Sequence, residues 1–484
     1  MNREFLLNVA LLLGINLLIK PFYLFGIDRV VQNTLAPGMY GLYFTLFGFA
    51  YIFQVLNDFG LANFNSRQVA QHRQLIRKYF PSLLLLKGIL LVAYLVVLVA
   101  LGWVWSYVPQ YGYLLAVIGL NVGLLGLLLF LRSNLSGLGL YRRDSLFSAL
   151  DRLLLIVIVG AMLWIPSLRS QFQLWWFVLA HTFALSISCI AVFLSFRSRL
   201  GPIRFRWQPA RLLYFVKKSA PFALVIFLMT AYTRLDAIML ERLLEDGLAQ
   251  VDRYAAAFRL LDAANAFTFL FASLLLPMFA RQLQQKIPVA PLVGMGIRLL
   301  WMGSTSLAII CWFFGEEIMS ALYPGTGAYD AKILAWLMIA FIGMAGTYVY
   351  GTLITAAGML FRLNIFFVLG VGVNISLNLW LIPQSAALGA AQATAFTQLL
   401  LFLIQLWQAK KYVDLPVSWP LMIRLSLFAL GMYGFGMICL DYISFSWIVK
   451  IILLIVVAPI WALCLQLIHP NDWQLIPAKR QMKP

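Results

Sequence analysis

The chain has 484 residues, of which 63% are hydrophobic and only 11% are charged, and its mean hydropathy is +0.90. A soluble domain is about 45–50% apolar, so this composition excludes a soluble globular protein and predicts an integral membrane protein. The formal net charge is +19, but no basic segment is interleaved with aromatic residues as in nucleic-acid-binding domains, so we expect no nucleic-acid partner.

Many apolar stretches are long enough to cross a membrane as helices, because a hydrocarbon core about 30 Å thick needs about 20 helical residues. An all-α polytopic fold with about 14 transmembrane helices is therefore expected. The first stretch contains Lys20 and no small-residue cleavage site, so we expect the mature chain to begin near Met1. The predicted spans are residues 5–26, 38–57, 82–107, 111–131, 146–165, 173–195, 214–241, 254–280, 292–315, 330–357, 361–383, 386–408, 419–441 and 445–468.

Lysine and arginine are distributed unequally between alternate loops. Most of the 36 Lys and Arg residues fall in segments that are cytoplasmic if Met1 is cytoplasmic. The positive-inside rule therefore predicts that both termini of this multi-pass membrane protein are cytoplasmic. Contacts with anionic membrane lipids account for part of the basic excess. The outer segments, which include the outer ends of spans, hold five: Arg29, Arg169, Arg242, Arg253 and Lys450.

The longest cytoplasmic connection, residues 195–219, is basic and separates six spans from the next six. We predict an N-lobe with this linker over residues 1–209, a C-lobe over 210–412, and a C-terminal helix pair with a basic tail over 413–484. A duplicated half with an even number of spans keeps its orientation, so the two lobes are expected to be parallel repeats. In support, residues 43–68 and 254–282 both begin Y-x-x-x-F and both end in Arg-Gln.

Catalytic motifs are missing from the sequence. It has no phosphate-binding G-x-x-x-x-G-K-[ST] loop, no HExxH and no G-x-S-x-G. The predicted outer loops are also short, which leaves little room for a catalytic domain. We therefore expect neither an enzyme nor catalytic residues, and no cofactor.

The cysteines and histidines do not form a pattern of metal ligands. Each cysteine falls inside a predicted span, where a thiol packs as a small apolar group. The histidines are far apart in the sequence and lack ligand spacing, so we expect neither a disulfide framework nor a metal site. These residues are Cys189, Cys311, Cys439 and Cys464, and His72, His181 and His469.

Ionisable residues deep inside spans are the most informative feature, because each costs several kcal/mol unless it is paired or lines a wet cavity. At 1.5 Å per residue, the five deepest lie in one layer roughly 7–12 Å below the outer surface. They are Lys20, Arg234, Asp236, Arg259 and Asp262. Arg259 and Asp262 are three residues apart and can pair on one helix face. Arg234 and Asp236 are two residues apart and cannot face each other. Either of these two could contact span 254–280.

Two interpretations of this layer are open. In the first, the charges have a purely structural role, because they pair with one another or extend to the nearby interface. In the second, they line a cationic, water-filled cavity in which a guanidinium binds phosphate through paired hydrogen bonds. Charges nearer the span ends are expected to extend to the interface: Lys87, Arg152, Arg298, Lys332 and Arg424. After span 38–57, "DFGLANFNSR" only weakly resembles the signature of major facilitator transporters, so we interpret Asp58 and Gly60 as the end of a helix.

Two segments resemble a known family. "LAPGMYGLYFTLFGFAYIFQVLNDFGLANFNSRQ" (35–68) is similar to the conserved opening of bacterial polysaccharide flippases, with its "l-G-p-x-x-y-G-l-y" turn, "D-x-G-l" and an arginine. "TRLDAIMLERLLEDGLAQVDRYAAAFRLLD" (233–262) resembles the start of their second half, "D-x-i-m-l" and then "Y-a-x-A-x-R". The resemblance covers nearly the whole chain and indicates an O-antigen-type lipid-linked oligosaccharide flippase of the multidrug/oligosaccharidyl-lipid/polysaccharide exporter superfamily.

This resemblance implies two six-helix lobes around a central cavity and alternating-access transport of an undecaprenyl pyrophosphate-linked oligosaccharide, for lipopolysaccharide O-antigen or exopolysaccharide. It also implies the polysaccharide polymerase and chain-length proteins as candidate partners. In related lipid II flippases an arginine in "A-n-R-l" faces the cavity, and Arg259 in "AAAFRLLD" takes the matching position. The two extra helices form a lipid-tail groove in those relatives, so spans 419–441 and 445–468 are expected to do the same.

We predict that Arg259 binds the pyrophosphate with help from Lys20 or Arg234, and that Asp262 and Asp236 orient these cations or couple an ion. The alternatives are a lipid II flippase, a drug/cation antiporter of the same superfamily, and a non-transporting scaffold of an envelope polysaccharide complex. An antiporter needs an acidic cavity, whereas the first half offers Lys20 and no deep carboxylate. The glycan, the energy source (a proton, a sodium ion, the membrane potential or none) and the oligomeric state are left open.

Overall fold

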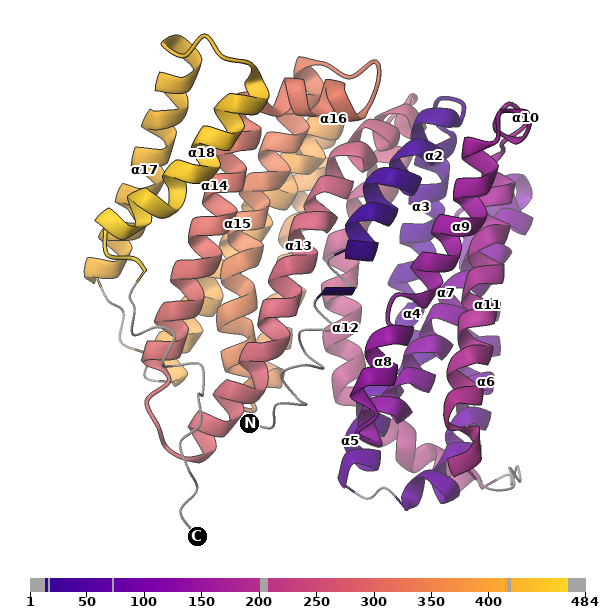
Figure 1. Cartoon of the computed structure of the whole chain (residues 1–484). Coiled ribbons are helices and arrows are strands. Elements are labelled where there is room, and N and C mark those ends of the chain that lie inside the picture. Colours follow the sequence, from indigo (N-terminus) through magenta and orange to yellow (C-terminus); the bar gives the residue numbers. More distant parts are fainter. Residues whose placement is uncertain are drawn as a thin grey trace. The chain divides into compact units, whose positions relative to one another are not determined.

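The computed structural model describes residues 14–15, 18–71, 74–200, 208–413, 415 and 419–468. Throughout these residues the chain forms helices joined by short turns, with no strand among them (Figure 1). The predicted all-α class is therefore confirmed. The chain divides into two compact units, Asn2–Glu241 and Arg242–Pro484, called here the N-unit and the C-unit. The predicted boundary between the lobes, residue 209, lies one helix before this division. The predicted organisation into three parts stays a prediction.

The N-unit is built around one central helix. Helix α7 packs against α3, α4, α5, α6 and α11. Its side chains Leu128, Leu131 and Leu135 join Phe80 and Phe196 in a buried apolar cluster. In chain order the elements are η1 (Tyr23–Asp28), α2 (Arg29–Thr34), α3 (Met39–Ile52), α4 (Gln54–Asp58), α5 (Leu61–Gln71), α6 (Leu75–Val104), α7 (Tyr107–Gly137), α8 (Tyr141–Phe147), α9 (Leu150–Trp164), α10 (Pro166–Arg169), α11 (Leu174–Phe196), η2 (Arg197–Arg199) and α12 (Pro209–Leu243).

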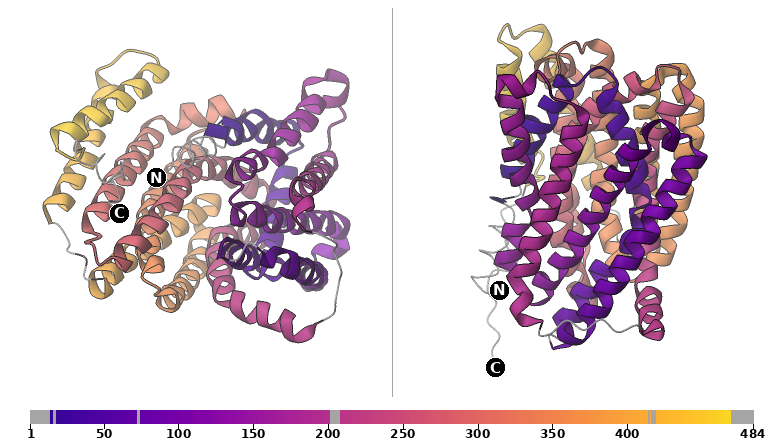
Figure 2. Two further views of the ribbon diagram at one scale, coloured as in Figure 1. Left: turned by 60° about the horizontal axis from the view of Figure 1, so that its bottom comes forward. Right: turned by 90° about the vertical axis from the view of Figure 1, so that its right-hand side faces the viewer.

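The C-unit also has a central helix. Helix α15 packs against α13, α14 and α16, and its glycines allow close approach. A Cβ atom added at Gly343 would lie 2.6 Å from the carbonyl carbon of Gln398 in α16, and one at Gly346 would overlap the ring of Phe402. The elements are α13 (Gly247–Gln284), α14 (Ala290–Leu322), α15 (Ala328–Ala356), α16 (Leu360–Tyr412), α17 (Trp419–Asp441) and α18 (Trp447–Cys464). Figure 2 shows the helices of each unit running side by side.

Helix α16 reverses direction within its range. Its backbone leaves the helical region at Ala386 (φ 49°), three residues after Pro383. Beyond the reversal the halves lie against each other, because a Cβ at Gly370 would lie 2.9 Å from the side chain of Leu401, and the guanidinium of Arg362 is 3.9 Å from the ring centre of Tyr412. The two predicted spans 361–383 and 386–408 are therefore two antiparallel helical segments.

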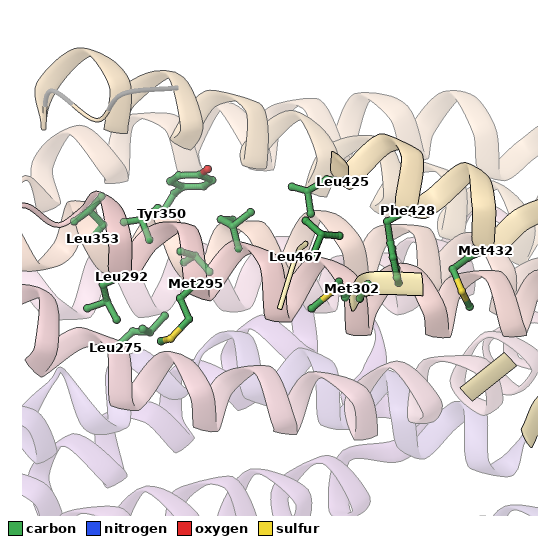
Figure 3. Close-up of a cluster of buried hydrophobic side chains, with 14 of the residues drawn as sticks. Leu275, Leu292, Met295, Met302, Tyr350, Leu353, Leu425, Phe428, Met432 and Leu467 are labelled. Carbon is green, nitrogen blue, oxygen red and sulfur yellow. The ribbon is translucent and has the colours of Figure 1, made fainter. Parts of the chain in front are cut away.

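The C-terminal helix pair packs on α14. Leu425, Phe428 and Met432 of α17 join Met295 and Met302 of α14 in one apolar cluster (Figure 3). The pair stands at the edge of the C-unit in Figure 1, beside α14. The predicted spans 419–441 and 445–468 are thus real helices that extend the second unit.

Among the described residues, ten helices are long and apolar enough to cross a membrane. Three predicted spans are absent from this set, and one of them, 214–241, lies in the long helix α12. Spans 361–383 and 386–408 count as one helix in it. Span 38–57 consists of the short apolar helix α3 and of α4, which are separated at Phe53. Span 5–26 lies largely outside the described residues, but its helix continues from Leu18 to Thr34, so its predicted end was wrong. A multi-pass membrane protein is confirmed.

Candidate functional site

Arg259 and Asp262 form the ion pair that their spacing predicted. On α13, Arg259 Nη1 lies 3.5 Å from Asp262 Oδ2, and the two side chains are 15% and 27% exposed. Tyr348 of α15 lies close enough to Asp262 for electrostatic interaction, and it also neighbours Asn265 of α13. The pair is half-buried, so the charge of Arg259 is balanced without being sealed away from a ligand.

Arg234 lies against an aromatic face of α3. The centre of its guanidinium is 5.8, 6.0 and 5.7 Å from the ring centres of Phe44, Phe47 and Tyr51. These three residues recur at helical spacing, so they lie along one side of α3. The quadrupole of an aromatic ring attracts a cation that lies over its face. The rings therefore hold the guanidinium of Arg234 in place, but they carry no net charge to neutralise it.

Helices α3 and α12 come close together at Gly48. A Cβ atom at this position would lie 3.5 Å from the carbonyl oxygen of Arg234. The glycine stands one turn after Phe44 on the same face, so the α12 backbone approaches α3 at that level. The aromatic rings on either side of Gly48 then lie where they can surround the guanidinium.

The remaining predicted residues occupy different settings. Asp236 is buried, with 1% exposure, on the same helix as Arg234. Lys20 is exposed and lies within electrostatic range of Arg152, Asp151 and Arg132. Lys20, Arg234 and Asp236 belong to the N-unit, and Arg259 and Asp262 belong to the C-unit. Their predicted convergence on one cavity stays a prediction.

The sequence interpretation missed Asp28. It ends the π-helical stretch η1 and is 1% exposed, and the hydroxyl of Tyr40 donates to its Oδ2 at 2.7 Å. Asp28 was placed in a loop because span 5–26 was predicted to stop too early. Nearby, the hydroxyl oxygen of Tyr23 lies 3.3 Å from Nε2 of His181. The central carbon of the Arg152 guanidinium lies 4.7 Å from the ring centre of Tyr23. Arg152 thus packs on an aromatic ring inside the N-unit.

The prediction that Lys87 extends to the interface was wrong. Its side chain is only 2% exposed, and Nζ lies 3.1 Å from Asp58 Oδ1. The ammonium also donates to the carbonyl of Asn57 at 2.9 Å. As predicted, Asp58 is the last residue of its helix, followed by Phe59 and Gly60 with positive φ. Lys87 therefore binds the C-terminal end of α4, where free carbonyls favour a cation.

A cavity of about 450 Å³ lies in the C-unit between α14, α16 and α17. Its walls are mostly apolar and include Trp301, Phe402 and Leu421, and Arg298 and Arg424 also line it. Both arginines were expected to extend to the interface, which stays a prediction, and both border this cavity. An apolar groove with two cations suits an apolar chain joined to an anionic group.

The cysteines lie in helices, as predicted. Cys189, Cys311 and Cys439 are buried in α11, α14 and α17, and Cys464 is exposed at the end of α18; all four are free thiols. In the part of the chain that the structure describes, no three His, Cys, Asp or Glu side chains gather as metal ligands.

Comparison with solved structures places the fold among known transporters. A lipid II flippase MurJ in an inward closed conformation matches with a TM-score of 0.70 at 15% identity, over 94% of this chain and 99% of that one. A MOP superfamily transporter from Pyrococcus furiosus matches with a TM-score of 0.57 at 11% identity, over 85% and 95%. An inward-facing multidrug resistance MATE transporter matches with a TM-score of 0.57 at 13% identity, over 84% and 94%.

Sequence comparison gives the family. No curated protein matches the chain. The sequence model described as "Polysaccharide biosynthesis protein" matches residues 5–283, which is more than half of the chain and includes both segments that carried the resemblance. The chain therefore belongs to the polysaccharide biosynthesis protein family and has the fold of the multidrug/oligosaccharidyl-lipid/polysaccharide exporter (MOP) superfamily.

Proposed function

We propose that this protein is a flippase that moves an undecaprenyl pyrophosphate-linked oligosaccharide across the bacterial inner membrane for surface polysaccharide assembly. The observation that carries the proposal is a set of half-buried cations, above all Arg234 and Arg259, in an apolar helical protein of a polysaccharide biosynthesis family. In this proposal the protein acts by alternating access, with both termini in the cytoplasm.

The chemistry of the substrate matches this charge arrangement. A pyrophosphate cannot cross hydrocarbon unaided, because burying an unpaired anion costs many kcal/mol, whereas an isoprenoid tail is stable in lipid. A cationic cavity that opens sideways to the bilayer lets the headgroup cross while the tail stays in lipid. Alternating exposure of the cavity to the two faces then completes transport.

Arg259 and Arg234 are assigned the pyrophosphate, with Lys20 assisting. A guanidinium offers two parallel N–H donors to phosphate oxygens, which gives both affinity and orientation. Asp262 holds Arg259 at 3.5 Å in the empty state, and an arriving phosphate competes with this carboxylate for the guanidinium. The aromatic rings around Arg234 orient it without adding a competing anion. Asp236 is the second candidate for orienting a cation or coupling an ion.

The apolar cavity between α14, α16 and α17 is assigned the lipid tail. Trp301, Phe402 and Leu421 provide an apolar wall, and Arg298 and Arg424 stand at the same cavity. Helix α17 forms one side of it, as expected for the C-terminal pair. This supports a tail groove that lies in the C-unit.

Two related substrates compete with the proposed one. The similarity in fold to a lipid II flippase favours lipid II as the second candidate. A drug/cation antiporter is disfavoured, because a cationic drug is repelled by Arg234, Arg259 and Lys20. A scaffold without transport activity is separated from all of these by measuring transport.

The proposal is tested by export of surface polysaccharide in a deletion strain that carries wild type, Arg259→Ala or Arg259→Lys. We expect the alanine variant to lose most export and to accumulate lipid-linked oligosaccharide on the inner leaflet. The lysine variant should recover part of the export, because lysine keeps the positive charge but loses the paired N–H donors of arginine. Arg169→Ala, in exposed α10, is the matched control and should export normally. Normal export by Arg259→Ala at equal expression would remove Arg259 from the site.

A further inference from the structure

A second cavity, with several polar residues in its lining, lies within the N-unit. Its lining residues come from the end of α3, from α4, α5 and α8, and from the C-terminal end of α7. Figure 1 labels α4, α5 and α8 toward one end of this unit. Its volume is about 360 Å³, near the lower end of the roughly 300–1,000 Å³ range of small-molecule sites. None of the residues predicted to bind substrate lines it. Its polar lining includes Tyr51, Gln54, Asp58, Arg132, Ser136 and Asp144.

The charges around this cavity are paired. Arg132 Nε lies 2.8 Å from Asp144 Oδ1, and both side chains are about one-fifth exposed. Asp58 is paired with the buried Lys87 at 3.1 Å. The lining is therefore close to neutral overall, which disfavours a pyrophosphate or a cationic drug as the ligand.

The same lining offers both hydrogen-bond donors and acceptors. Carboxylate oxygens of Asp58 and Asp144 accept, the guanidinium of Arg132 donates, and the amide of Gln54 and the hydroxyl of Ser136 do both. A neutral ligand with many hydroxyl groups can use such a mixture, because each hydroxyl both donates and accepts. The ring of Tyr51 adds an apolar surface for the C–H face of a sugar.

The cavity adjoins the guanidinium of Arg234. Tyr51 takes part in both, since its ring centre is 5.7 Å from that guanidinium and its side chain lines the cavity. Gln54 and Asp58 of α4, which follow the break at Phe53, line the same cavity as Tyr51. One side chain, that of Tyr51, therefore links the guanidinium of Arg234 to the cavity.

We propose that this cavity is a glycan subsite, which binds the sugar residues nearest the pyrophosphate of the transported lipid. The inference rests on the proposed function. In a pyrophosphate-linked saccharide the first sugar is bonded directly to phosphate, so a sugar site must adjoin the phosphate site. Arg234 binds the anion, and Gln54, Ser136 and the paired charges bind the neutral hydroxyls next to it. This subsite makes the protein select for lipids that already carry sugar.

The test compares two probes on the purified full-length protein in nanodiscs. One is undecaprenyl pyrophosphate, and the other is the lipid-linked oligosaccharide pool extracted from the deletion strain. We expect the wild type to bind the sugar-bearing lipid more tightly. Gln54→Ala and Ser136→Ala should each weaken that binding by about three- to tenfold, through the loss of one or two hydrogen bonds, while binding of undecaprenyl pyrophosphate stays unchanged.

The controls separate this inference from the proposed function. Gln171→Ala, on an exposed turn of the N-unit, should bind both lipids as wild type does, and Ser136→Thr should keep sugar selectivity because it keeps the hydroxyl. Equal affinity of the wild type for both lipids, or equal weakening of both by Gln54→Ala and Ser136→Ala, would overturn the glycan subsite and leave the flippase proposal standing. Binding of neither lipid by the wild type would overturn both.

Discussion

The three aromatic rings around Arg234 illustrate, at the scale of single residues, how a membrane protein can hold a cation in readiness for an anion. Phe44, Phe47 and Tyr51 each place a ring centre within about 6 Å of the guanidinium. Ring faces attract a cation without covering its N–H donors as a bidentate carboxylate does. We therefore expect these rings to orient the guanidinium that binds the phosphate in the proposed function.

Replacing one ring tests this arrangement. Phe47→Leu keeps the position apolar but removes one cation–π contact, which is worth about 0.5–2 kcal/mol. We expect undecaprenyl pyrophosphate to bind roughly two- to thirtyfold more weakly to this variant. Phe183→Leu, on the exposed side of α11, is the matched control. If both variants bind as tightly as wild type, the rings do not position Arg234 for the ligand.

Lys87 and Asp58 are a buried pair whose removal should be non-additive. Lys87→Met leaves the Asp58 carboxylate without its ammonium, and breaking a buried pair lowers the free energy of unfolding by about 3 kcal/mol. We expect the double variant Lys87→Met/Asp58→Asn to recover more than half of this loss, because the stranded charge is gone. Thermal unfolding of the purified variants measures the loss and recovery of stability, with Lys410→Met as an exposed control. Equal losses in the single and double variants would contradict the pairing.

Sequence reasoning reached some of these residues and missed others for identifiable reasons. The pairing of Arg259 with Asp262 followed from their i,i+3 spacing, which is local information. Lys87 was misjudged because its partner, Asp58, comes from a different helix 29 residues away. The aromatic face behind Arg234 also comes from a distant helix, so spacing along α12 alone could not indicate it.

At the scale of elements, the fold of the C-unit depends on the close packing of α15 against α16. The Cβ that Gly343 lacks would lie 2.6 Å from a carbonyl carbon of α16, so the two backbones approach more closely than side chains allow. Small residues at such crossings are the common device of membrane helix packing. The reversal at Ala386 then brings both halves of α16 into the same unit.

A matched pair of glycine substitutions tests this packing. Gly343→Ala forces the crossing apart and should lower the free energy of unfolding by about 1–3 kcal/mol, the usual effect of overpacking. Gly372→Ala places the same methyl group where nothing lies within 4 Å, so helix propensity should make it neutral or slightly stabilising. Thermal unfolding in detergent checks both. Equal behaviour of the two variants would contradict close packing at Gly343.

At the scale of the whole molecule, composition and hydropathy predicted the all-α membrane class and the positions of most spans. The predicted spans 361–383 and 386–408 correspond to the two antiparallel segments of α16, whose backbone leaves the helical region at Ala386, three residues after Pro383. The end of the first span was wrong, since polar residues after Gly26 suggested a loop although the helix continues to Thr34. Which residues face a cavity depends on contacts between distant helices, and that is why the sugar-sized cavity of the N-unit had no sequence signal.

The whole-molecule claim is that this chain carries a sugar headgroup through the bilayer. The most direct test reconstitutes the purified protein in liposomes with lipid-linked oligosaccharide whose glycan carries a dithionite-quenchable fluorophore, under an imposed membrane potential and a pH or sodium gradient. We expect wild type to make the inner-leaflet fluorophore accessible to dithionite, and we expect Arg234→Ala and Arg259→Ala to slow this at least tenfold. An inner-leaflet fraction that stays protected with wild-type protein, under every imposed gradient, would contradict the flippase account.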